Sequence, residues 1–365
     1  MSAPHSTLRR WLARIIVLSV ATLIGFCLAE IATRIAWRKE AILFPRYHTD
    51  ATYGQYRIRR LRPNTTFHHT SADGRWTFAT NSQGYRDTRE WNYAPTPGVR
   101  RVLVLGDSHT QGFECRQDHT YSAVLEKRLR AMGQPTEVYN CGVSGFGTAE
   151  ELALLENEGL KYKPDAVVVG WFANDLNDNV NAGLFAVREG ELIEEKHEHL
   201  PGVRVLNALN KCAVMRWLSE DSYFYSLLFN RVWEWRRGLN WQRSNAAAVE
   251  MASAAPANDP RLLGYQQDLA ERLLSRMQET CAKVGVRLIV VDIPSWKAID
   301  DFESSIPPAV LSEVQSHQVE VLTSEAALGR YRGVAEIFVA HGQHHISEMA
   351  HLQIAMALAD LMRVP

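Results

Sequence analysis

Apolar and polar positions along the middle of the chain follow a rhythm that predicts a parallel sheet wound by helices. Short, nearly continuous apolar runs lie at 101–105, 137–139, 165–170 and 286–291. Apolar residues recur at helical spacing in 121–131, 149–160, 262–284 and 347–362. Buried strands that alternate with helices are typical of right-handed parallel crossovers. The pattern therefore predicts an α/β fold with a doubly wound parallel sheet, and a further short apolar run lies at 337–339.

The segments beside this core are patterned differently. Residues 41–98 are polar and rich in turns, and two β-like stretches flank Asp73-Gly74, which predicts a hairpin. Residues 181–260 interrupt the rhythm with charged and aromatic stretches and end in an Ala/Ser/Asn/Pro-rich run. We predict an extension over 41–98 and a core domain over 99–365 that contains 181–260 as an insertion. The aromatic residues of the insertion are expected to pack onto the core or to line a substrate groove.

The first 40 residues predict a single membrane-spanning helix. Residues 15–29 carry no charge, but at about 1.5 Å per residue they cover only about 22 Å of a roughly 30 Å hydrocarbon layer. Trp11 and Trp37 suit the two interfaces, and Glu30 and Arg34 can neutralise each other. Arginines before the segment favour a cytoplasmic amino terminus. We expect a signal anchor with the rest of the chain in the periplasm or at the cell surface; a cleaved signal peptide and a buried helix are the alternatives.

Composition narrows the class of protein. Hydrophobic residues make up 46% and charged residues 22% of the 365 positions, which supports a folded core. Forty Lys and Arg against 41 Asp and Glu leave a formal charge of −1, so no overall field attracts nucleic acid, and we expect no nucleic-acid partner. Five cysteines are too few for a disulfide framework, and their odd number leaves at least one thiol unpaired.

Three polar loops follow successive predicted strands, where ligands of open α/β sheets bind. Gly106-Asp107-Ser108 follows the first strand and can aim a hydroxyl from a tight turn into the crevice. The second loop, 140–148, has three glycines in six residues, whose backbone N–H groups can face a ligand. The third carries Asn174, whose amide can donate to an oxyanion. Taken alone, each motif also fits a helix cap, a plain tight loop or an Asx turn.

Histidines gather just before the last predicted helix, where four of the 13 fall within residues 341–351. A histidine from this group that reaches Ser108 would be the general base that a hydroxyl nucleophile needs at neutral pH. The alternative is a metal site, since neutral imidazoles at i, i+3 and i+4 spacing can share an ion. No cysteine or carboxylate of the cluster is as clearly placed, so we expect neither a metal nor another cofactor.

Taken together and in this order, the four blocks resemble those of the SGNH/GDSL hydrolase family, which contribute Ser, Gly, Asn and His. The resemblance covers most of 99–180 and 261–365, and the arrangement is similar to membrane-anchored bacterial members with a long amino-terminal extension. It implies that 99–365 is a hydrolase domain built on a flavodoxin-like sheet. The roles that it implies are these: Ser108 as nucleophile and first oxyanion donor, Gly145 as second donor, Asn174 as third donor and His345 as general base.

The chain departs from the family pattern in two places. The third block usually has a glycine where Phe172 stands here, two residues before Asn174, and this narrows the pocket. The family usually places an Asp three residues before the catalytic His, but Gly342 stands three residues before His345. A backbone carbonyl such as that of Gly342, or an acid recruited from elsewhere, would orient the imidazole; otherwise the site is degenerate. His344 is the alternative base, and His345 is favoured because Ile-Ser follows it.

The resemblance implies a serine ester hydrolase that forms an acyl-enzyme on Ser108 from carboxylic acyl or acetyl esters. Acylated small molecules, lipids and polysaccharides of the cell envelope are the expected substrates. The alternatives are an acyltransferase on the same fold and a binding or scaffold protein that has lost catalysis. Four neighbours of the motif residues are expected to contact substrate: Asp107, His109, Phe172 and Asp175.

Overall fold

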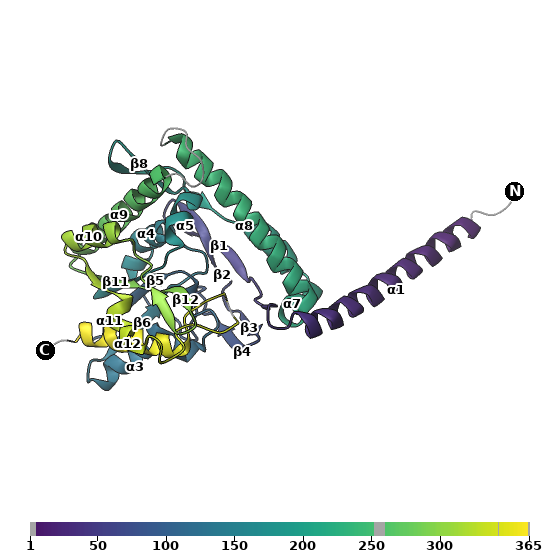
Figure 1. Ribbon diagram of the computed structural model, residues 1–365, viewed down its shortest axis with the longest axis horizontal. Coiled ribbons are helices and arrows are strands. Elements are labelled where there is room, and N and C mark those ends of the chain that lie inside the picture. The colour runs from purple at the N-terminus through teal and green to yellow at the C-terminus, as the bar shows by residue number, and fades with distance from the viewer. Residues whose placement is uncertain (1–4, 252–259, 342, 364–365) are drawn as a thin grey trace.

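The computed structural model describes residues 5–251, 260–341 and 343–363, and a five-stranded parallel sheet lies at its centre (Figure 1). The strands lie in the order β6-β5-β7-β11-β14, and every neighbouring pair is parallel. Numbered along the chain this is the order 2-1-3-4-5 of flavodoxin-like folds, which confirms the predicted fold class. The strands are β5 (Arg100–Gly106), β6 (Thr136–Asn140), β7 (Ala166–Trp171), β11 (Arg287–Asp292) and β14 (Glu320–Leu322).

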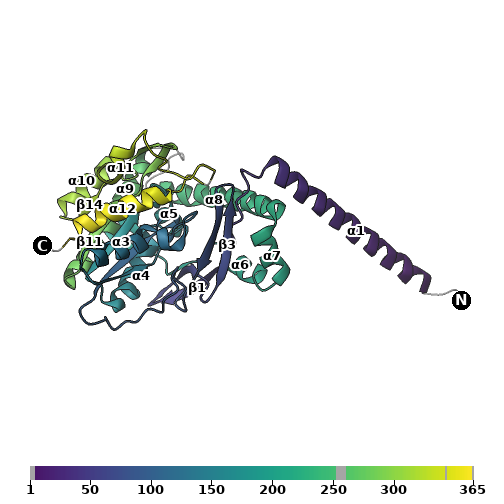
Figure 2. The ribbon, with the colours of Figure 1, turned by 90° about the horizontal axis from the view of Figure 1, so that it is seen from below.

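Helices cover both faces of this sheet (Figure 2). Helices α3 and α12 pack together on one face, and α4, α5, α9 and α10 cover the other. Strands β5 and β7 are apolar at nearly every position and are therefore buried on both sides. The helices are α2 (Ser108–Gln111), α3 (Tyr121–Ala131), α4 (Thr148–Asn157), α5 (Asp175–Ala182), α9 (Pro260–Lys283), α10 (Pro308–Ser316), α11 (Ser324–Leu328) and α12 (Glu348–Leu361), with 3-10 turns at Gln117–His119, Gly159–Tyr162 and Gly329–Tyr331.

The longer elements lie where the apolar pattern predicts them, and the hydroxyls of Thr120 and Ser347 cap the first turns of α3 and α12. The fifth strand differs from the sequence pattern. The apolar run at 337–339 forms no strand of the sheet; its Phe338 makes only an isolated bridge to Ile346. Strand β14 supplies the sheet edge instead, and with three residues it is too short to show a periodicity.

The extension over 41–98 is more ordered than its polar composition suggests. Strands β1 (His48–Tyr53) and β2 (Tyr56–Leu61) pair in antiparallel fashion, and the two-residue β10 (Glu198–His199) adds to β2 in parallel. Strands β3 (Thr66–Ser71) and β4 (Gly74–Ala79) form a hairpin in the predicted region, but its two turn residues are Ala72 and Asp73, and Gly74 already pairs with Ser71. A second small hairpin, β12 (Ser295–Ala298) and β13 (Asp301–Glu303), follows β11.

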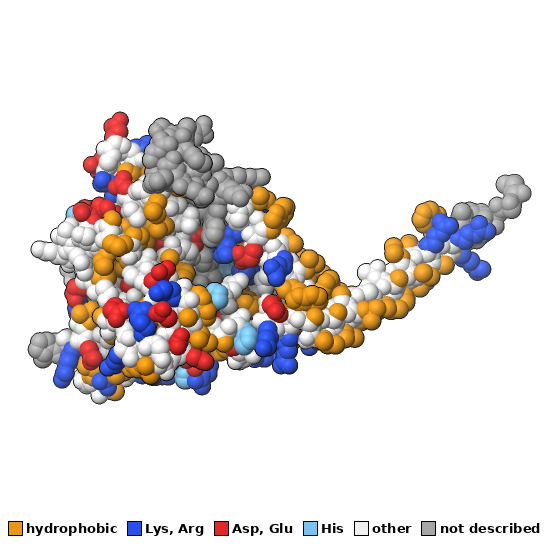
Figure 3. Space-filling model, in the orientation of Figure 1, with side chains coloured by type: hydrophobic (Ala, Val, Ile, Leu, Met, Phe, Trp, Pro, Cys, Tyr) orange, Lys and Arg blue, Asp and Glu red, His pale blue; other side chains and the backbone are white. Residues whose placement is uncertain are grey.

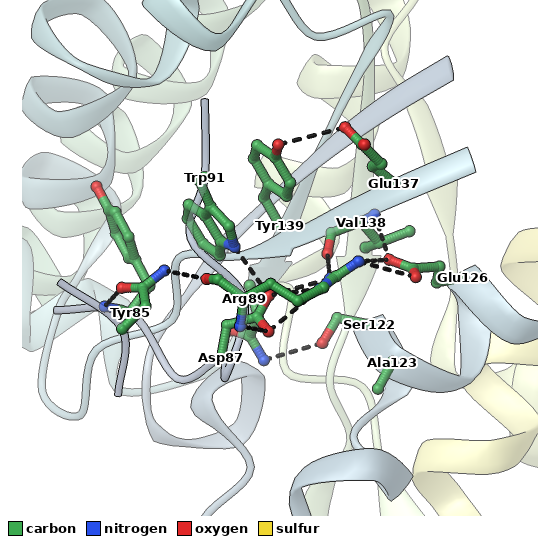
Figure 4. A network of polar contacts seen from close by, with 12 residues as sticks. Tyr85, Asp87, Arg89, Trp91, Ser122, Ala123, Glu126, Glu137, Val138 and Tyr139 are labelled. Carbon is green, nitrogen blue, oxygen red and sulfur yellow. Dashed lines mark hydrogen bonds and ion pairs between the residues drawn. The ribbon is translucent and has the colours of Figure 1, made fainter. Parts of the chain in front are cut away.

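A network of polar and aromatic contacts joins the end of the extension to the core (Figure 4). Arg89 donates to Asp87 at 3.0 Å and to Glu126 of α3 at 2.9 Å. The Trp91 indole N–H donates to Asp87 at 2.8 Å, and its ring stacks on Tyr139 of β6 with centroids 4.3 Å apart. The extension is therefore packed against the sheet and is not a free linker.

The inserted segment forms a hairpin, β8 (Phe185–Arg188) with β9 (Glu191–Glu194), and three helices, α6 (Val203–Leu209), α7 (Ala213–Asp221) and α8 (Tyr223–Met251). Aromatic residues of α8 pack onto the extension. The Trp233 ring lies 4.7 Å from the Arg46 guanidinium and stacks on Phe229. These rings therefore bind the insertion to the extension. Residues 252–259, at the end of the predicted insertion, lie outside the described residues.

Helix α1 (His5–Ala36) extends away from the rest of the molecule (Figure 1). Its stretch Arg9–Ala36 is long and apolar enough to cross a membrane, by length and composition, and apolar side chains are exposed along it (Figure 3). Its carboxyl end is held by α8. Glu30 accepts the backbone N–H groups of Tyr223 and Phe224 at 3.0 and 2.9 Å, and it pairs with Arg34 at 2.6 Å as expected.

Candidate active site

The nucleophile candidate lies in a sharp turn at the end of β5. Gly106 has a φ of +152°, and a Cβ there would collide with the Thr110 side chain, so the turn requires glycine. Ser108 begins the short α2, and the Asp107 carboxylate accepts the N–H of His109 at 2.8 Å. The turn therefore presents the Ser108 hydroxyl at the carboxyl end of the sheet.

Ser108 and His345 meet in space although 237 residues separate them. The Ser108 Oγ and His345 Nε2 atoms lie 2.9 Å apart. The 337–339 run holds the loop that carries His345. The Val339 N–H donates to the His345 carbonyl at 2.9 Å, and the bridge between Phe338 and Ile346 fixes the next residue. The structure thus places the candidate base at hydrogen-bonding distance from the candidate nucleophile.

The environment of His345 keeps its imidazole neutral. Burial lowers its pKa well below the usual value, and the nearby His109 and His344 act in the same direction. The His109 ring centroid lies 4.6 Å from that of His345. A histidine whose pKa is lowered in this way is neutral at neutral pH, and in the tautomer with its proton on Nδ1 the Nε2 atom can accept the Ser108 proton.

Gly145 is brought to the same edge of the sheet because β6 and β5 are neighbours. Its φ of +76° turns the loop, and the backbone N–H groups of Gly145 and Ser108 make no backbone hydrogen bond within the described ranges. The buried guanidinium of Arg59, from β2, donates to the Ser144 carbonyl directly beside Gly145. Arg59 therefore fixes the loop from the side of the extension.

Asn174 follows β7, the other neighbour of β5, and ends the loop before α5. Its Nδ2 donates to Asp178 at 2.8 Å, which fixes the amide plane. Burial raises the pKa of Asp178 to about 7. Burial also raises the pKa of Asp107 to about 6, while the His109 N–H, which Asp107 accepts at 2.8 Å, favours its ionised form. The Asn174 side chain lies near enough to Asp107 to lower this pKa, so it lies at the turn that carries Ser108.

The four residues expected to contact substrate are largely covered. Asp107, His109 and Asp175 are at most 2% exposed, so they form the floor of the site and do not present a surface to a ligand. Phe172 is half-buried and packs on His109 with ring centroids 4.2 Å apart. The buried Glu151 lies close enough to raise the pKa of Asp175 further. Phe172 alone of the four keeps an intermediate exposure.

The four clustered histidines contact different neighbours. His341 pairs with Asp73 of the hairpin at 2.8 Å, and the His344 ring packs on Trp296. The Nδ1 atom of His351, which is fully buried, accepts the Tyr121 N–H at 3.2 Å. Among the described residues no three His, Cys, Asp or Glu side chains are grouped to hold a metal ion.

Three residues near the site were not identified from the sequence, and all are buried: Arg59, His69 and Glu114. Arg59 and His69 lie in the extension, where nothing in the local pattern connects them to a loop more than 80 residues away. Glu114 lies only six residues after Ser108, but no spacing rule marks it. The Gly342 carbonyl, one expected acceptor for the His345 ring, lies outside the described residues.

The sequence profile of the GDSL-like lipase/acylhydrolase family matches residues 104–307, which is more than half of the chain. The chain therefore belongs to this family, whose members hydrolyse esters. An arylesterase of Vibrio mimicus is 32% identical over 82 residues, which are 22% of this chain and 41% of that protein. The match thus spans about two fifths of that relative.

Solved structures of low sequence identity also resemble the chain. A lipase/acylhydrolase from Enterococcus faecalis is 15% identical with a TM-score of 0.37, over 72% of this chain and 95% of that one. A catalytic mutant of an acetylxylan esterase from Geobacillus stearothermophilus is 14% identical with a TM-score of 0.41, over 73% of this chain and 95% of that one.

Proposed function

We propose that this protein is a serine hydrolase of carboxylic esters that works through an acyl-enzyme on Ser108. The 2.9 Å contact between Ser108 Oγ and His345 Nε2, in a chain of the GDSL-like family, carries the proposal. His345 takes the hydroxyl proton as Oγ attacks the ester carbonyl, and it returns that proton to the leaving alcohol. The N–H groups of Ser108 and Gly145 and the Asn174 amide donate to the oxyanion. Water then releases the acid.

The covered site and the relatives support a proposal for the substrate class. Phe172 occupies the place where a glycine would leave room, and the floor is closed by buried side chains. This favours a short acyl group, such as acetyl, on a larger alcohol. An arylesterase and an acetylxylan esterase among the similar proteins are consistent with short acyl esters. Acetylated glycans of the cell envelope fit both this site and an anchored enzyme.

A fluorophosphonate probe tests the nucleophile directly. We expect it to label the wild-type protein and not Ser108→Ala, because the probe reacts only with an activated serine. In a graded series of aryl esters, acetyl and propionyl esters should be cleaved faster than octanoyl esters. Equal labelling of wild type and Ser108→Ala would remove Ser108 from the mechanism, and faster cleavage of the long esters would contradict the short acyl pocket.

We also propose that α1 anchors the enzyme with the hydrolase domain outside the cytoplasm. Its exposed apolar surface and its arginine-rich start support this orientation. A reporter that is active only outside the cytoplasm, fused after residue 40, should be active in cells. The matched control is the same reporter before residue 9, which should be inactive. Activity of a reporter that works only in the cytoplasm, at the position after residue 40, would overturn the orientation.

A further inference from the structure

The Nδ1 atom of His345, the second nitrogen of the proposed general base, has no partner among the described residues. His345 Nδ1 is buried and makes no hydrogen bond within the part of the chain that the structure describes. When Nε2 accepts the Ser108 proton, the ring becomes a buried cation whose charge is shared by Nδ1. Such a cation is costly unless a negative group balances it. The usual position of that group, three residues earlier, is Gly342 and has no side chain.

An unpartnered carboxylate directly follows an aromatic ring that packs on His345. Glu114 is 2% exposed, and neither of its oxygens has a hydrogen-bond partner among the described residues. It directly follows Phe113, on which the His345 ring stacks with centroids 4.4 Å apart. The Ser71 hydroxyl and the Gln343 N–H lie near enough to favour the ionised form, while burial raises its pKa to about 7. The Gln343 N–H places Glu114 beside the loop that carries the general base.

The conformation of Glu114 also marks it as a constrained residue. Its φ is +57°, in the left-handed region that side chains other than glycine and asparagine rarely adopt. Such backbone strain persists only where the surroundings hold it, and it gathers at functional sites. Here the left-handed conformation of Glu114 turns the chain directly after Phe113, whose ring stacks on His345.

His69 of the hairpin completes this group. Its Nε2 lies 3.9 Å from Glu114 Oε1, and its ring packs on Phe113 with centroids 4.2 Å apart. It is fully buried, and both of its nitrogens are unpartnered among the described residues. Burial lowers its pKa well below the usual value, and His345 and Arg86 act in the same direction. His69 is therefore a neutral, buried imidazole that the hairpin places beside Glu114.

The other carboxylates near the loop are already engaged. Their contacts are these: Asp73 with His341 at 2.8 Å, Asp107 with the His109 N–H at 2.8 Å, and Glu348 with Arg116. Each of these acids is held by a group other than the catalytic imidazole. Of these four described acids, Glu114 alone makes no hydrogen bond to another described residue.

We propose that Glu114 is the positioning acid of this site, with His69 as its buried neighbour, in place of the Asp that this chain lacks. The inference rests on the proposed Ser108 mechanism. The Ser108 proton moves to His345 Nε2 and later to the leaving alcohol. Throughout, the His345 Nδ1 proton stays on the ring, and the Glu114 carboxylate stabilises the positive charge from that side.

Glu114→Gln tests the proposal by steady-state kinetics with a short aryl ester. We expect kcat to fall by about 10²- to 10⁴-fold with KM changed less than about threefold, because the acid acts after substrate binds. Glu114→Asp should recover part of the loss. The matched control is Glu137→Gln, which removes a carboxylate paired with Arg101 at the opposite end of the sheet and should leave kcat unchanged. Wild-type kcat in Glu114→Gln would overturn the proposal.

The pH profile separates a charge effect from a structural one. In the wild type, kcat should rise with pH through about 7 as Glu114 ionises. In Glu114→Gln this step should disappear, and the remaining rise should lie at lower pH, where the buried His345 loses its proton. Asp73 and the histidines at 69, 109 and 344 face the two groups and remain in both proteins. An unchanged profile would contradict the role.

Nitrogen NMR of the full chain, labelled on histidine, gives a readout that does not need activity. In the wild type we expect the His345 proton on Nδ1, and in Glu114→Gln a shift of the Nδ1 resonance or a mixture of tautomers. Unchanged His345 signals would overturn the inference. The His345 signal could change in Glu114→Gln while the wild-type protein cleaves no ester. This result would support the link between Glu114 and His345 and would refute the proposed function.

Discussion

Replacing His345 with alanine is expected to lower kcat for a short ester by about 10⁴- to 10⁶-fold, to nearly the same level as Ser108→Ala. The reason is the 2.9 Å contact between His345 Nε2 and Ser108 Oγ. Without the imidazole no group accepts the hydroxyl proton, and a serine hydroxyl is a poor nucleophile at neutral pH. The double variant should be no slower than either single one, because the two side chains act as a unit. Steady-state kinetics and the rate of fluorophosphonate labelling measure this.

The neighbouring histidine provides a matched control. His344 is exposed, packs on Trp296, and has a φ of +58°. We therefore choose His344→Asn, since asparagine tolerates the left-handed conformation. This variant should keep kcat within about threefold of the wild type. If His344→Asn lost activity and His345→Ala kept it, the base would be the other histidine, and the geometry that supports the mechanism would be wrong.

Four of the five strands of the sheet could be predicted from the sequence because they rest on local patterns. The runs at 101–105 and 165–170 are buried on both faces, so their apolar residues are uninterrupted, and the helices between them carry a clear period. The two small sheets of the extension lack such a signal. Strand β2 contains three arginines, one of them the buried Arg59. A buried charge that pairs with a distant loop cannot be told from a solvated one by its neighbours in sequence.

The residues of the candidate site also differ in how far the sequence predicts them. Ser108, Gly145 and Asn174 can be placed from sequence because each directly follows a predicted strand, and adjacent parallel strands end at one edge. For the general base, the sequence left two adjacent candidates, His344 and His345, because the loop before α12 has no regular period. Glu114 could not be assigned to the site. Its relation to His345 depends on how Phe113 packs, which is a property of the tertiary structure.

The second large effect is expected for Gly145→Ala, which should lower kcat by about 10²- to 10³-fold, the usual result of losing one oxyanion donor. Gly145 has a φ of +76°, and a Cβ there would lie 2.5 Å from the Nη2 atom of Arg59. Arg59 is buried and holds the Ser144 carbonyl, so it has little room to retreat. The loop must move instead, and its N–H groups move away from the oxyanion.

Gly133→Ala separates this contact from backbone strain alone. Gly133 has a nearly equal φ of +78°, but a Cβ there meets nothing within 4 Å. Both variants pay about 1–2 kcal/mol for a left-handed alanine, so both should lower the melting temperature, and only Gly145→Ala should lower kcat. Equal kcat in the two variants would mean that the Gly145 N–H is not an oxyanion donor. Because Arg59 belongs to β2, a loss confined to Gly145→Ala would also indicate that the extension helps to set the geometry of the oxyanion site.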